Sequence, residues 1–374
     1  MTVRIKKVTT DHELKLFLRF PEQLYNNNSY RVPPLFKNEY RMLHKDINPA
    51  FEHCEARYWL ASKGNRIVGR VAGILNVAHQ KEWGQKYLRF AWLDFEDDAL
   101  ISELLLNEVE LWANKTGALA VHGPLGFTDH DPVGILVEGF SELGTSATRY
   151  NYPYYSVHLE NLGYHKDIDW VEYEIQVPDP PLENIRRIAT TVMRRYNLKL
   201  LEVDKKKDLL PYGEELFRLL MKTHDHLYGV VSLTLKQIEF YIKQYWDVIN
   251  PEFVQVITDQ DNNVVGFGFT IPSLSYALQR AKGKLFPLGF IYILRALAKN
   301  ECADLCLIAI DPKYQGKGVN AILLNRINMI FNKFGIVRVE SNPELENNRL
   351  IQQQWKYFER RQHKRRRCYI KYLE

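Results

Sequence analysis

Cysteine is scarce in this sequence. The chain has 374 residues and four cysteines, which are Cys54, Cys302, Cys306 and Cys368. A disulfide-stapled fold needs more cysteine in a shorter chain, and no Cys-x-x-Cys pair of the metal-binding type occurs. We therefore expect a protein of a reducing compartment without a metal site.

Long apolar runs and an excess of one charge are missing too. No stretch reaches the roughly 18 apolar residues of a transmembrane helix, and the longest one, 285–294, contains Pro287 and Gly289. The first residues alternate as in a strand and lack the pattern of a signal peptide. Lys+Arg 50 against Asp+Glu 45 leaves a formal charge of +5, too small to indicate a nucleic-acid binder. These absences favour a cytoplasmic protein.

Aromatic residues, by contrast, are plentiful. They make up 13% of the chain, as 22 Tyr, 18 Phe and 7 Trp, within an apolar fraction of 46%. Such a chain can bury large cores or line a large apolar groove. At roughly 100–200 residues per domain, the length predicts two domains.

The order of predicted elements repeats along the chain. Each half reads as a strand, helices, a hairpin, a long strand, a helix, a strand and a helix. Thr10 and Glu13 have the spacing of a capping box at the first helix. Three prolines within 178–181 mark a linker, so we place the boundary between an N-terminal domain, 1–177, and a C-terminal domain, 178–374. The same patterns predict helices at 99–115, 318–334 and 347–358, and strands at 302–310 and 336–340.

The stretch 305–324 carries the clearest chemical signal. It reads as an apolar strand, a tight loop with Gly316, Lys317 and Gly318, and a helix. The start of a helix exposes unpaired amides and a partial positive charge, which attract phosphate. Glycines let the backbone approach such an anion. The alternative is that the glycines only shape the turn.

The composite of strand end and loop resembles the acyl-CoA loop of the GNAT superfamily of N-acyltransferases. That loop reads Gln/Arg-x-x-Gly-x-Gly/Ala after a Val-x-Pro-like triplet. Residues 310–312 match the triplet, and 315–318 match the loop, with Asn320 where Gly or Ala is usual. The resemblance implies an α/β (α+β) protein of two GNAT-like domains, each a mixed, mostly antiparallel twisted sheet flanked by helices. It also implies an acetyl-CoA or acyl-CoA donor and an amine acceptor.

The family further implies where the donor lies. The strand before the loop separates from its neighbour and pairs with the pantetheine arm, a role that falls to Ala309 and Ile310. An Asn early in the following helix contacts the cofactor in many members, which points to Asn347 or Asn348. The implied cofactor-binding set is Ala309, Ile310, Gln315, Gly316, Lys317, Gly318, Val319, Asn320 and Asn347.

Two residues are candidates for proton transfer. Glu340 ends a predicted strand beside the loop-bearing strand and could take the proton of an ammonium nucleophile. Its alternative is a solvated strand-end Glu. The family's general-acid Tyr falls on Trp355, which cannot donate a proton in this role, so Tyr357 is the candidate acid. The alternative for Tyr357 is a packing aromatic.

The N-terminal half lacks a phosphate loop. Glu96, Asp97 and Asp98 stand where a diphosphate would dock and would repel it, so we interpret this copy as a degenerate GNAT-like domain. The basic stretch 360–367 suggests nucleic-acid binding, but no recognition motif accompanies it. A solvated edge strand, or an anion or membrane contact, is the interpretation we favour, with no nucleic-acid partner.

The insertion 272–300 bears on the acceptor. It combines Lys and Arg with bulky apolar residues, as an interfacial segment does, although a helical pair packed on the sheet is the alternative. Three segments, 309–324, the Gly-Lys-Leu-Phe-Pro stretch at 283–287 and the Tyr-Asn-Tyr-Pro-Tyr-Tyr stretch at 150–155, make the whole chain resemble two-domain bacterial proteins. Some of those proteins are associated with N-acylation of long-chain sphingoid bases in ceramide synthesis. The hypotheses are thus transfer to a small amine, transfer to a lipid amine at the inner membrane surface, and non-catalytic acyl-CoA sensing. An acyl carrier protein is an alternative donor.

Overall fold

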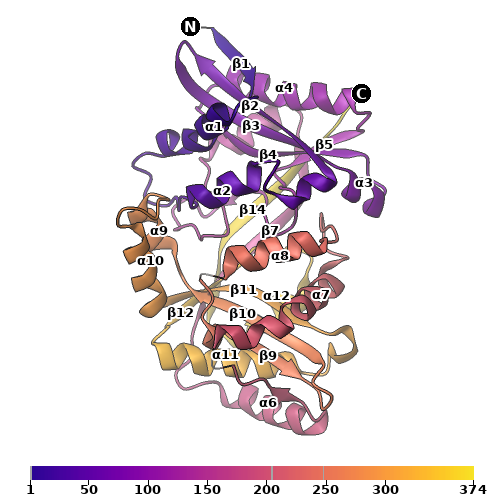
Figure 1. Ribbon diagram of the computed structural model, residues 1–374, viewed down its shortest axis with the longest axis vertical. Coiled ribbons are helices and arrows are strands. Elements are labelled where there is room, and N and C mark those ends of the chain that lie inside the picture. The colour runs from indigo at the N-terminus through magenta and orange to yellow at the C-terminus, as the bar shows by residue number, and fades with distance from the viewer. Residues whose placement is uncertain (1, 204, 247) are drawn as a thin grey trace.

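The computed structural model describes residues 2–203, 205–246 and 248–374. One continuous twisted sheet runs through the molecule in the order β1-β2-β3-β4-β5-β14-β7-β12-β11-β10-β9-β8, with β6 and β13 attached at its middle. Each half of this sheet carries its own helices, and the two halves stack along the long axis of the molecule (Figure 1). The predicted fold class is therefore confirmed.

The N-terminal half builds its sheet from a meander of antiparallel strands. Helix α4 covers one face of this sheet with Leu105 and Trp112, and α1 and α2 cover the other face with Phe17 and Met42. Its elements are β1 (Val3–Lys7), α1 (Asp11–Leu24), α2 (Phe36–Leu43), β2 (Cys54–Lys63), β3 (Arg66–Asn76), α3 (Val77–Trp83), β4 (Tyr87–Phe95), α4 (Ala99–Lys115), β5 (Ala120–Gly123), β6 (Ile135–Glu138), α5 (Tyr154–Asn161) and β7 (His165–Gln176).

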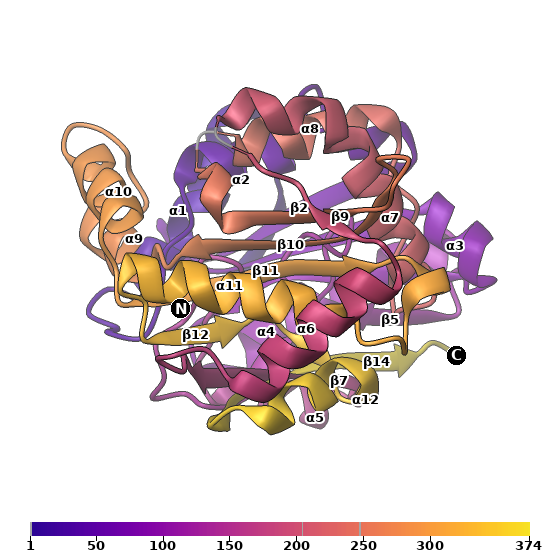
Figure 2. The ribbon, with the colours of Figure 1, turned by 90° about the horizontal axis from the view of Figure 1, so that it is seen from below.

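The C-terminal half repeats this arrangement. Helices α6 and α11 pack on one face of its sheet and α7 on the other (Figure 2). Its elements are α6 (Glu183–Arg195), β8 (Lys199–Leu200), α7 (Gly213–His224), α8 (Leu235–Tyr245), β9 (Val254–Thr258), β10 (Val264–Pro272), α9 (Ser275–Ala281), α10 (Gly289–Ala298), β11 (Cys302–Ile310), α11 (Asn320–Phe334), β12 (Arg338–Ser341), β13 (Glu344–Leu345), α12 (Arg349–Gln352) and β14 (Arg360–Tyr372).

The two halves exchange strands at the centre. Strand β14, near the end of the chain, lies between β5 and β7 and pairs antiparallel with both. Strand β7, which precedes the proline-rich linker, pairs with β12 of the C-terminal half. The boundary at 177/178 stays a prediction, and the sheet crosses it without interruption.

The basic stretch 360–367 lies in β14, so the expectation of a solvated edge strand is wrong. The strand is central, and its cations meet carboxylates of β7: Arg366 binds Glu172 at 2.5 Å, and Arg367 binds Asp169 at 2.8 Å. Arg366 and Glu172 are fully buried. The cations of the strand are therefore paired inside the sheet, so removing either partner would leave an uncompensated buried charge. A reading of one strand alone could not detect these partners.

Several local predictions hold. Thr10 and Glu13 form the capping box of α1, and the predicted bounds of α4 and β11 match the structure. The predicted helix at 347–358 is wrong in extent, because α12 covers only Arg349–Gln352 and a 3₁₀ turn, Gln353–Tyr357, follows it. The insertion 272–300 folds as the helical hairpin α9–α10.

Candidate functional site

The glycine loop between β11 and α11 is open at the helix start. Gly316 and Gly318 have φ of 70° and 80°, a region that only glycine enters at little cost. No side chain caps α11 at Val319, whereas Asp311 caps the 3₁₀ turn before the loop. Within the part of the chain that the structure describes, the amides of Gly316, Gly318 and Val319 have no hydrogen-bond acceptor.

The surroundings of these amides suit an anion. The Lys317 ammonium lies 5.6 Å from the ring centre of Tyr196 and 5.7 Å from that of Tyr314, so cation–π attraction holds it beside the loop. A Cβ on Gly316 would meet no atom within 4 Å, so the loop is open there. Gln315 instead turns inward and donates Nε2–H to the Ile310 carbonyl at 3.0 Å. Unpaired amides, a helix start and a cation together make a loop whose chemistry suits an anion.

Strands β11 and β12 separate as the GNAT resemblance implies. Their parallel pairing ends at Leu305↔Ser341, and the register of β10 against β11 shifts at Cys306. Asn342 spans the opening, with its amide nitrogen donating to the Cys306 carbonyl at 2.9 Å.

The main-chain groups along β11 face alternate sides. The Ala309 carbonyl lies toward β10, 3.0 Å from where a Cβ on Gly266 would be. Residues of a strand alternate, so the main chain of Ile308 faces the gap, and so does that of Ile310, whose carbonyl Gln315 already occupies. Ile308 therefore turns its main-chain groups into the gap, a position that the sequence analysis did not single out.

A cavity of about 430 Å³ lies between the two halves and reaches this gap. Residues 305–308 of β11 form one wall, and residues 128–133 of the N-terminal half form another. Its apolar lining continues to Leu274 and Leu278 on α9. The cavity thus joins the separated strands to the hairpin α9–α10.

Two carboxyl groups in the cavity wall are unusual. Glu344 accepts from the Trp355 indole at 2.8 Å through Oε1, while Oε2 is buried and lacks a partner among the described residues. Asp131 accepts the Phe127 amide at 2.7 Å through Oδ2, while Oδ1 is likewise unpartnered. Burial raises the pKa of each carboxyl to about 7. Sequence analysis missed both groups, because nothing local in the chain marks their burial.

Glu340 lies elsewhere. Its Oε2 accepts from the Lys364 ammonium at 2.8 Å, within the central ion-pair cluster, and it does not line the cavity. Burial raises the pKa of Glu340, and the Lys364 charge opposes that rise. Tyr357 is 48% exposed under Lys356, and Asn347 is exposed, so neither lines the cavity, although Asn348 does. The roles predicted for Glu340, Tyr357 and Asn347 stay predictions.

Among the described residues, Cys306 is the only cysteine in the cavity wall. Burial raises the pKa of this thiol well above its usual range. A protonated thiol is a weak nucleophile. The arrangement therefore favours direct transfer between bound reactants over a covalent intermediate on this cysteine.

In the N-terminal half, the chain itself fills the corresponding gap. Strands β4 and β5 pair only as far as Arg89↔His122, and the Leu125 amide then donates to the Phe90 carbonyl at 3.0 Å. The guanidinium of Arg89 donates to the Gly126 carbonyl at 2.9 Å, and the next residue, Phe127, is fully buried against Phe51 and Trp92.

The start of α4 is blocked as well. Asp98 caps the helix through the Leu100 amide at 2.9 Å and pairs with Lys63 at 2.6 Å. Glu96 pairs with Arg66, and Asp97 contacts His158 at 2.9 Å. The helix start that could hold a diphosphate thus holds the chain's own carboxylates.

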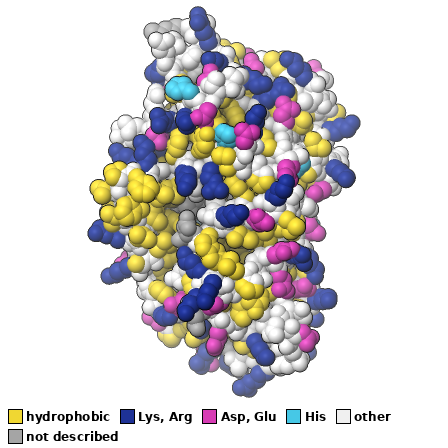
Figure 3. Space-filling view, in the orientation of Figure 1, with side chains coloured by type: hydrophobic (Ala, Val, Ile, Leu, Met, Phe, Trp, Pro, Cys, Tyr) yellow, Lys and Arg dark blue, Asp and Glu magenta, His cyan; other side chains and the backbone are white. Residues whose placement is uncertain are grey.

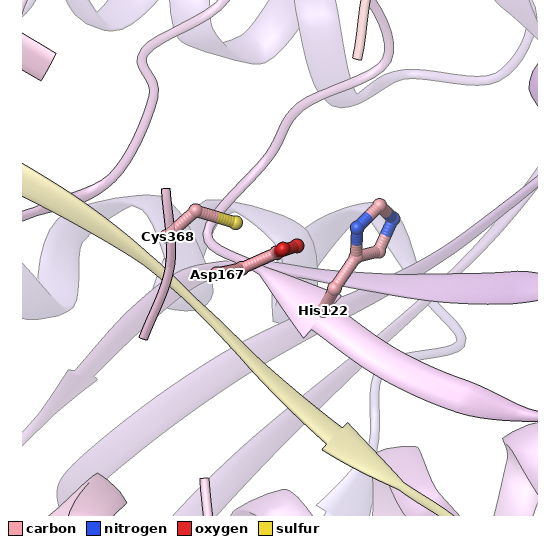
Figure 4. Close-up of side chains that lie close together, drawn as sticks. All are labelled: His122, Asp167 and Cys368. Carbon is pink, nitrogen blue, oxygen red and sulfur yellow. The ribbon is translucent and has the colours of Figure 1, made fainter. Parts of the chain in front are cut away.

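Three potential metal ligands meet beside this filled gap. His122 of β5, Asp167 of β7 and Cys368 of β14 point toward one another, with their ligand atoms within 4.8 Å of one another (Figure 4). The Tyr228 hydroxyl lies 3.1 Å from His122 Nδ1 and 3.5 Å from Cys368 Sγ, and it also bonds Asp167. Since that hydroxyl takes the place an ion would need, we interpret the cluster as a hydrogen-bonded one.

Comparison with known proteins follows the same division. The acetyltransferase (GNAT) family matches residues 214–353, which contain the open loop and the separated strands. The chain is 25% identical over 353 residues to Protein YghO of Escherichia coli, covering 92% of this chain and 89% of that protein. It is 26% identical over 315 residues to a bacterial ceramide synthase of Caulobacter vibrioides, covering 82% and 80%.

Solved structures extend the likeness to the whole fold. A tandem GNAT protein from the clavulanic acid biosynthesis pathway superposes with a TM-score of 0.56 at 11% identity, over 99% of this chain and 98% of that one. A probable N-acyltransferase from Enterococcus faecalis gives 0.55 at 9% identity, over 100% and 73%. Residues 214–353 thus match the acetyltransferase (GNAT) family, and the chain as a whole has the fold of tandem GNAT proteins.

Proposed function

We propose that this protein is an acyl-CoA-dependent N-acyltransferase that works in its C-terminal half. One observation carries the proposal: β11 ends in an uncapped anion-binding loop and, four to five residues earlier, borders an open gap that leads into the cavity. At about 3.3 Å per residue, these two features lie roughly 15 Å apart along the strand. A donor with a diphosphate at one end and a thioester at the other suits that spacing.

In this arrangement the loop amides and Lys317 bind the diphosphate. The free main-chain groups of Ile308 pair with the pantetheine arm, and the thioester lies near the Cys306 bulge. The loop residues 315–320 remain those named from the sequence, except that the Gln315 side chain acts by holding the Ile310 carbonyl. Binding in this way positions the acyl carbon at the cavity, and positioning is the main contribution that such a site makes to rate.

Glu344 is the base that this geometry favours. With a pKa of about 7, its carboxylate is partly ionised at neutral pH and can accept a proton from an ammonium in the cavity. The freed amine attacks the thioester carbon, the C–N bond forms, the C–S bond breaks, and the electron pair leaves on sulfur. The nitrogen loses its second proton as the amide forms. One of the two protons reaches the thiolate from Glu344 or, in the role predicted from the sequence, from Tyr357, and the other leaves to solvent.

The cavity wall supports an amine acceptor. Asp129, Asp131 and Glu344 line it, and these carboxyl groups favour a cationic acceptor. The remaining carboxylate, Glu39, is already paired with Arg149.

A lipid amine with a long chain is a second candidate acceptor. The apolar lining that reaches α9 offers space for alkyl groups, and a relative 26% identical to this chain is named a bacterial ceramide synthase. The same lining would equally accept a long acyl chain, delivered on CoA or on an acyl carrier protein.

The test combines binding with turnover. Calorimetry with coenzyme A should show one site per chain, and release of free thiol from acetyl-CoA and palmitoyl-CoA should depend on an amine from a panel of short and long-chain amines. Acyl carrier protein loaded with the same acyl groups tests the alternative donor. Binding without any amine-dependent thiol release would favour the non-catalytic sensor, and absence of binding would refute the proposal.

A further inference from the structure

The hairpin α9–α10 carries the most prominent apolar surface of the molecule. Its exposed large side chains are Tyr276, Phe286, Leu288, Phe290 and Leu294, with Phe286 79% exposed at the tip. Figure 3 shows this surface as the yellow area at the left edge, with dark blue side chains beside it, and Figure 1 places the hairpin there. A soluble surface seldom leaves such side chains together without a contact to make.

The charge of this segment is one-sided. Residues 272–300 contain five Lys and Arg and no Asp or Glu, which equals the whole formal excess of +5 in the chain. All five cations are exposed: Arg280, Lys282, Lys284, Arg295 and Lys299. Only Lys284 has an acidic partner within the described residues, Glu22 at 4.0 Å. The other four are free to meet an external anionic surface.

The hairpin is attached to the N-terminal half near the loop that joins its two helices. Gln279 donates to the carbonyls of Ser29 and Arg31 at 2.8 and 2.9 Å, and the Gly283 carbonyl accepts from the Phe36 amide at 3.0 Å. A Cβ on Gly283 would lie 2.4 Å from the Pro34 carbonyl, so the two segments are in close contact. The exposed apolar side chains of the loop, Phe286 and Leu288, therefore lie on a segment held in place by these contacts.

The inner side of the same hairpin belongs to the cavity. Leu274 and Leu278 line the cavity from α9, while Tyr276 on the same helix is 64% exposed. The hairpin thus separates the cavity from the outside by the thickness of one helix.

We infer that the hairpin α9–α10 inserts its apolar tip into the interface of an anionic lipid bilayer and so places the cavity at the membrane surface. Apolar side chains on an interfacial element enter the acyl boundary while flanking cations meet lipid phosphates. A second copy of the chain fits less well, because a two-fold contact would bring the five cations of one copy against the same five of the other. The membrane contact does not depend on the proposed acyl transfer. The entry of a lipid acceptor along α9 does rest on that proposed function.

The experiment is flotation of the full chain with vesicles of phosphatidylcholine alone and of phosphatidylcholine with phosphatidylglycerol. The wild-type protein should float with the anionic vesicles and detach at high salt. The double variant F286S/L294S should lose roughly tenfold or more of its partitioning, since it removes two inserted side chains. R280E/R295E should lose binding to anionic vesicles as well. The matched controls are Val157→Ser on α5, also exposed, and Lys86→Glu, an exposed lysine of the N-terminal half.

Each outcome decides the inference. Absence of wild-type flotation, or equal flotation of F286S/L294S and wild type, overturns it. Light scattering that shows a dimer lost in F286S/L294S would assign the surface to a second copy instead. Coenzyme A affinity of F286S/L294S should equal that of the wild type, so a failure of CoA binding in both would count against the proposed function and not against the membrane contact.

Discussion

Both halves of the molecule open a parallel strand pair near the middle of a sheet, and they treat the opening differently. In the N-terminal half, Leu125 closes the gap between β4 and β5, the chain that follows is buried at Phe127, and Asp98 caps the adjoining helix. In the C-terminal half, the gap between β11 and β12 borders a cavity, and α11 starts without a side-chain cap. One topology therefore gives a packed structural unit where the chain satisfies its own amides, and an open loop beside a cavity where it leaves them free.

The largest expected effect comes from filling the open loop. Gly318→Glu places a carboxylate against the free amides and should weaken coenzyme A binding roughly a hundredfold or more, as measured by calorimetry. A Cβ at Gly318 meets Val192 and Ile188 at 3.3 and 3.4 Å, so Gly316→Glu, which has open space, is the companion variant. Gly64→Glu, also at a positive φ in an open turn, should bind normally. Unchanged affinity in both loop variants would refute the site.

Next comes the filled gap. Phe127→Ala should lower the free energy of unfolding by about 3–5 kcal/mol, because it empties a fully buried position. Ile308→Ala, which already borders the cavity, should cost far less, within about 1–2 kcal/mol. Denaturant titration measures both. Equal losses of unfolding free energy in the two variants would mean that both gaps are packed alike, which would contradict the difference between the two halves.

Glu344→Gln should reduce turnover about a hundredfold with coenzyme A affinity unchanged. The raised pKa means that the carboxyl is protonated below about pH 7 and acts as a base only above it, so the wild-type rate should rise with pH through that range. The Glu344→Gln variant should lack this rise of the rate with pH.

Glu340→Gln is the comparison for that variant. This substitution disturbs the ion pair with Lys364, so the free energy of unfolding of the variant should fall. Its rate should still rise with pH in assays kept well below its melting temperature. If the rise of the rate with pH is lost in Glu340→Gln and kept in Glu344→Gln, Glu340 is the base, as predicted from the sequence.

A smaller effect is expected at the capped helix. Asp98→Ala should cost about 1 kcal/mol of unfolding free energy as a lost N-cap. It should not create a second coenzyme A site, since Glu96, Asp97 and the filled gap remain. A stoichiometry of two in calorimetry would contradict the account of this half.

The smallest effect concerns Tyr357. With 48% of its surface exposed and no place in the cavity wall, Tyr357→Phe should change turnover less than about threefold. A loss of tenfold or more in stopped-time thiol release would instead support its role as general acid.

Sequence reasoning succeeded where the signal is local. The bounds of α4 and β11 follow from caps and apolar patterning, and the glycine loop follows from residues adjacent in the chain. It failed where partners are distant: the cations of β14 resembled a solvated edge until β7 supplied Asp169 and Glu172. The same cause hid Glu344, whose burial depends on Trp355 and on packing between the halves.

The exchange of β14 has a consequence for biosynthesis. The N-terminal half cannot complete its sheet until Tyr369–Tyr372 can pair with β5, at the far end of the chain. During translation the edge of β5 therefore stays unpaired after the N-terminal half is made, until nearly two hundred further residues have been added. A nascent chain of this kind depends on late closure and on protection of that edge in the meantime.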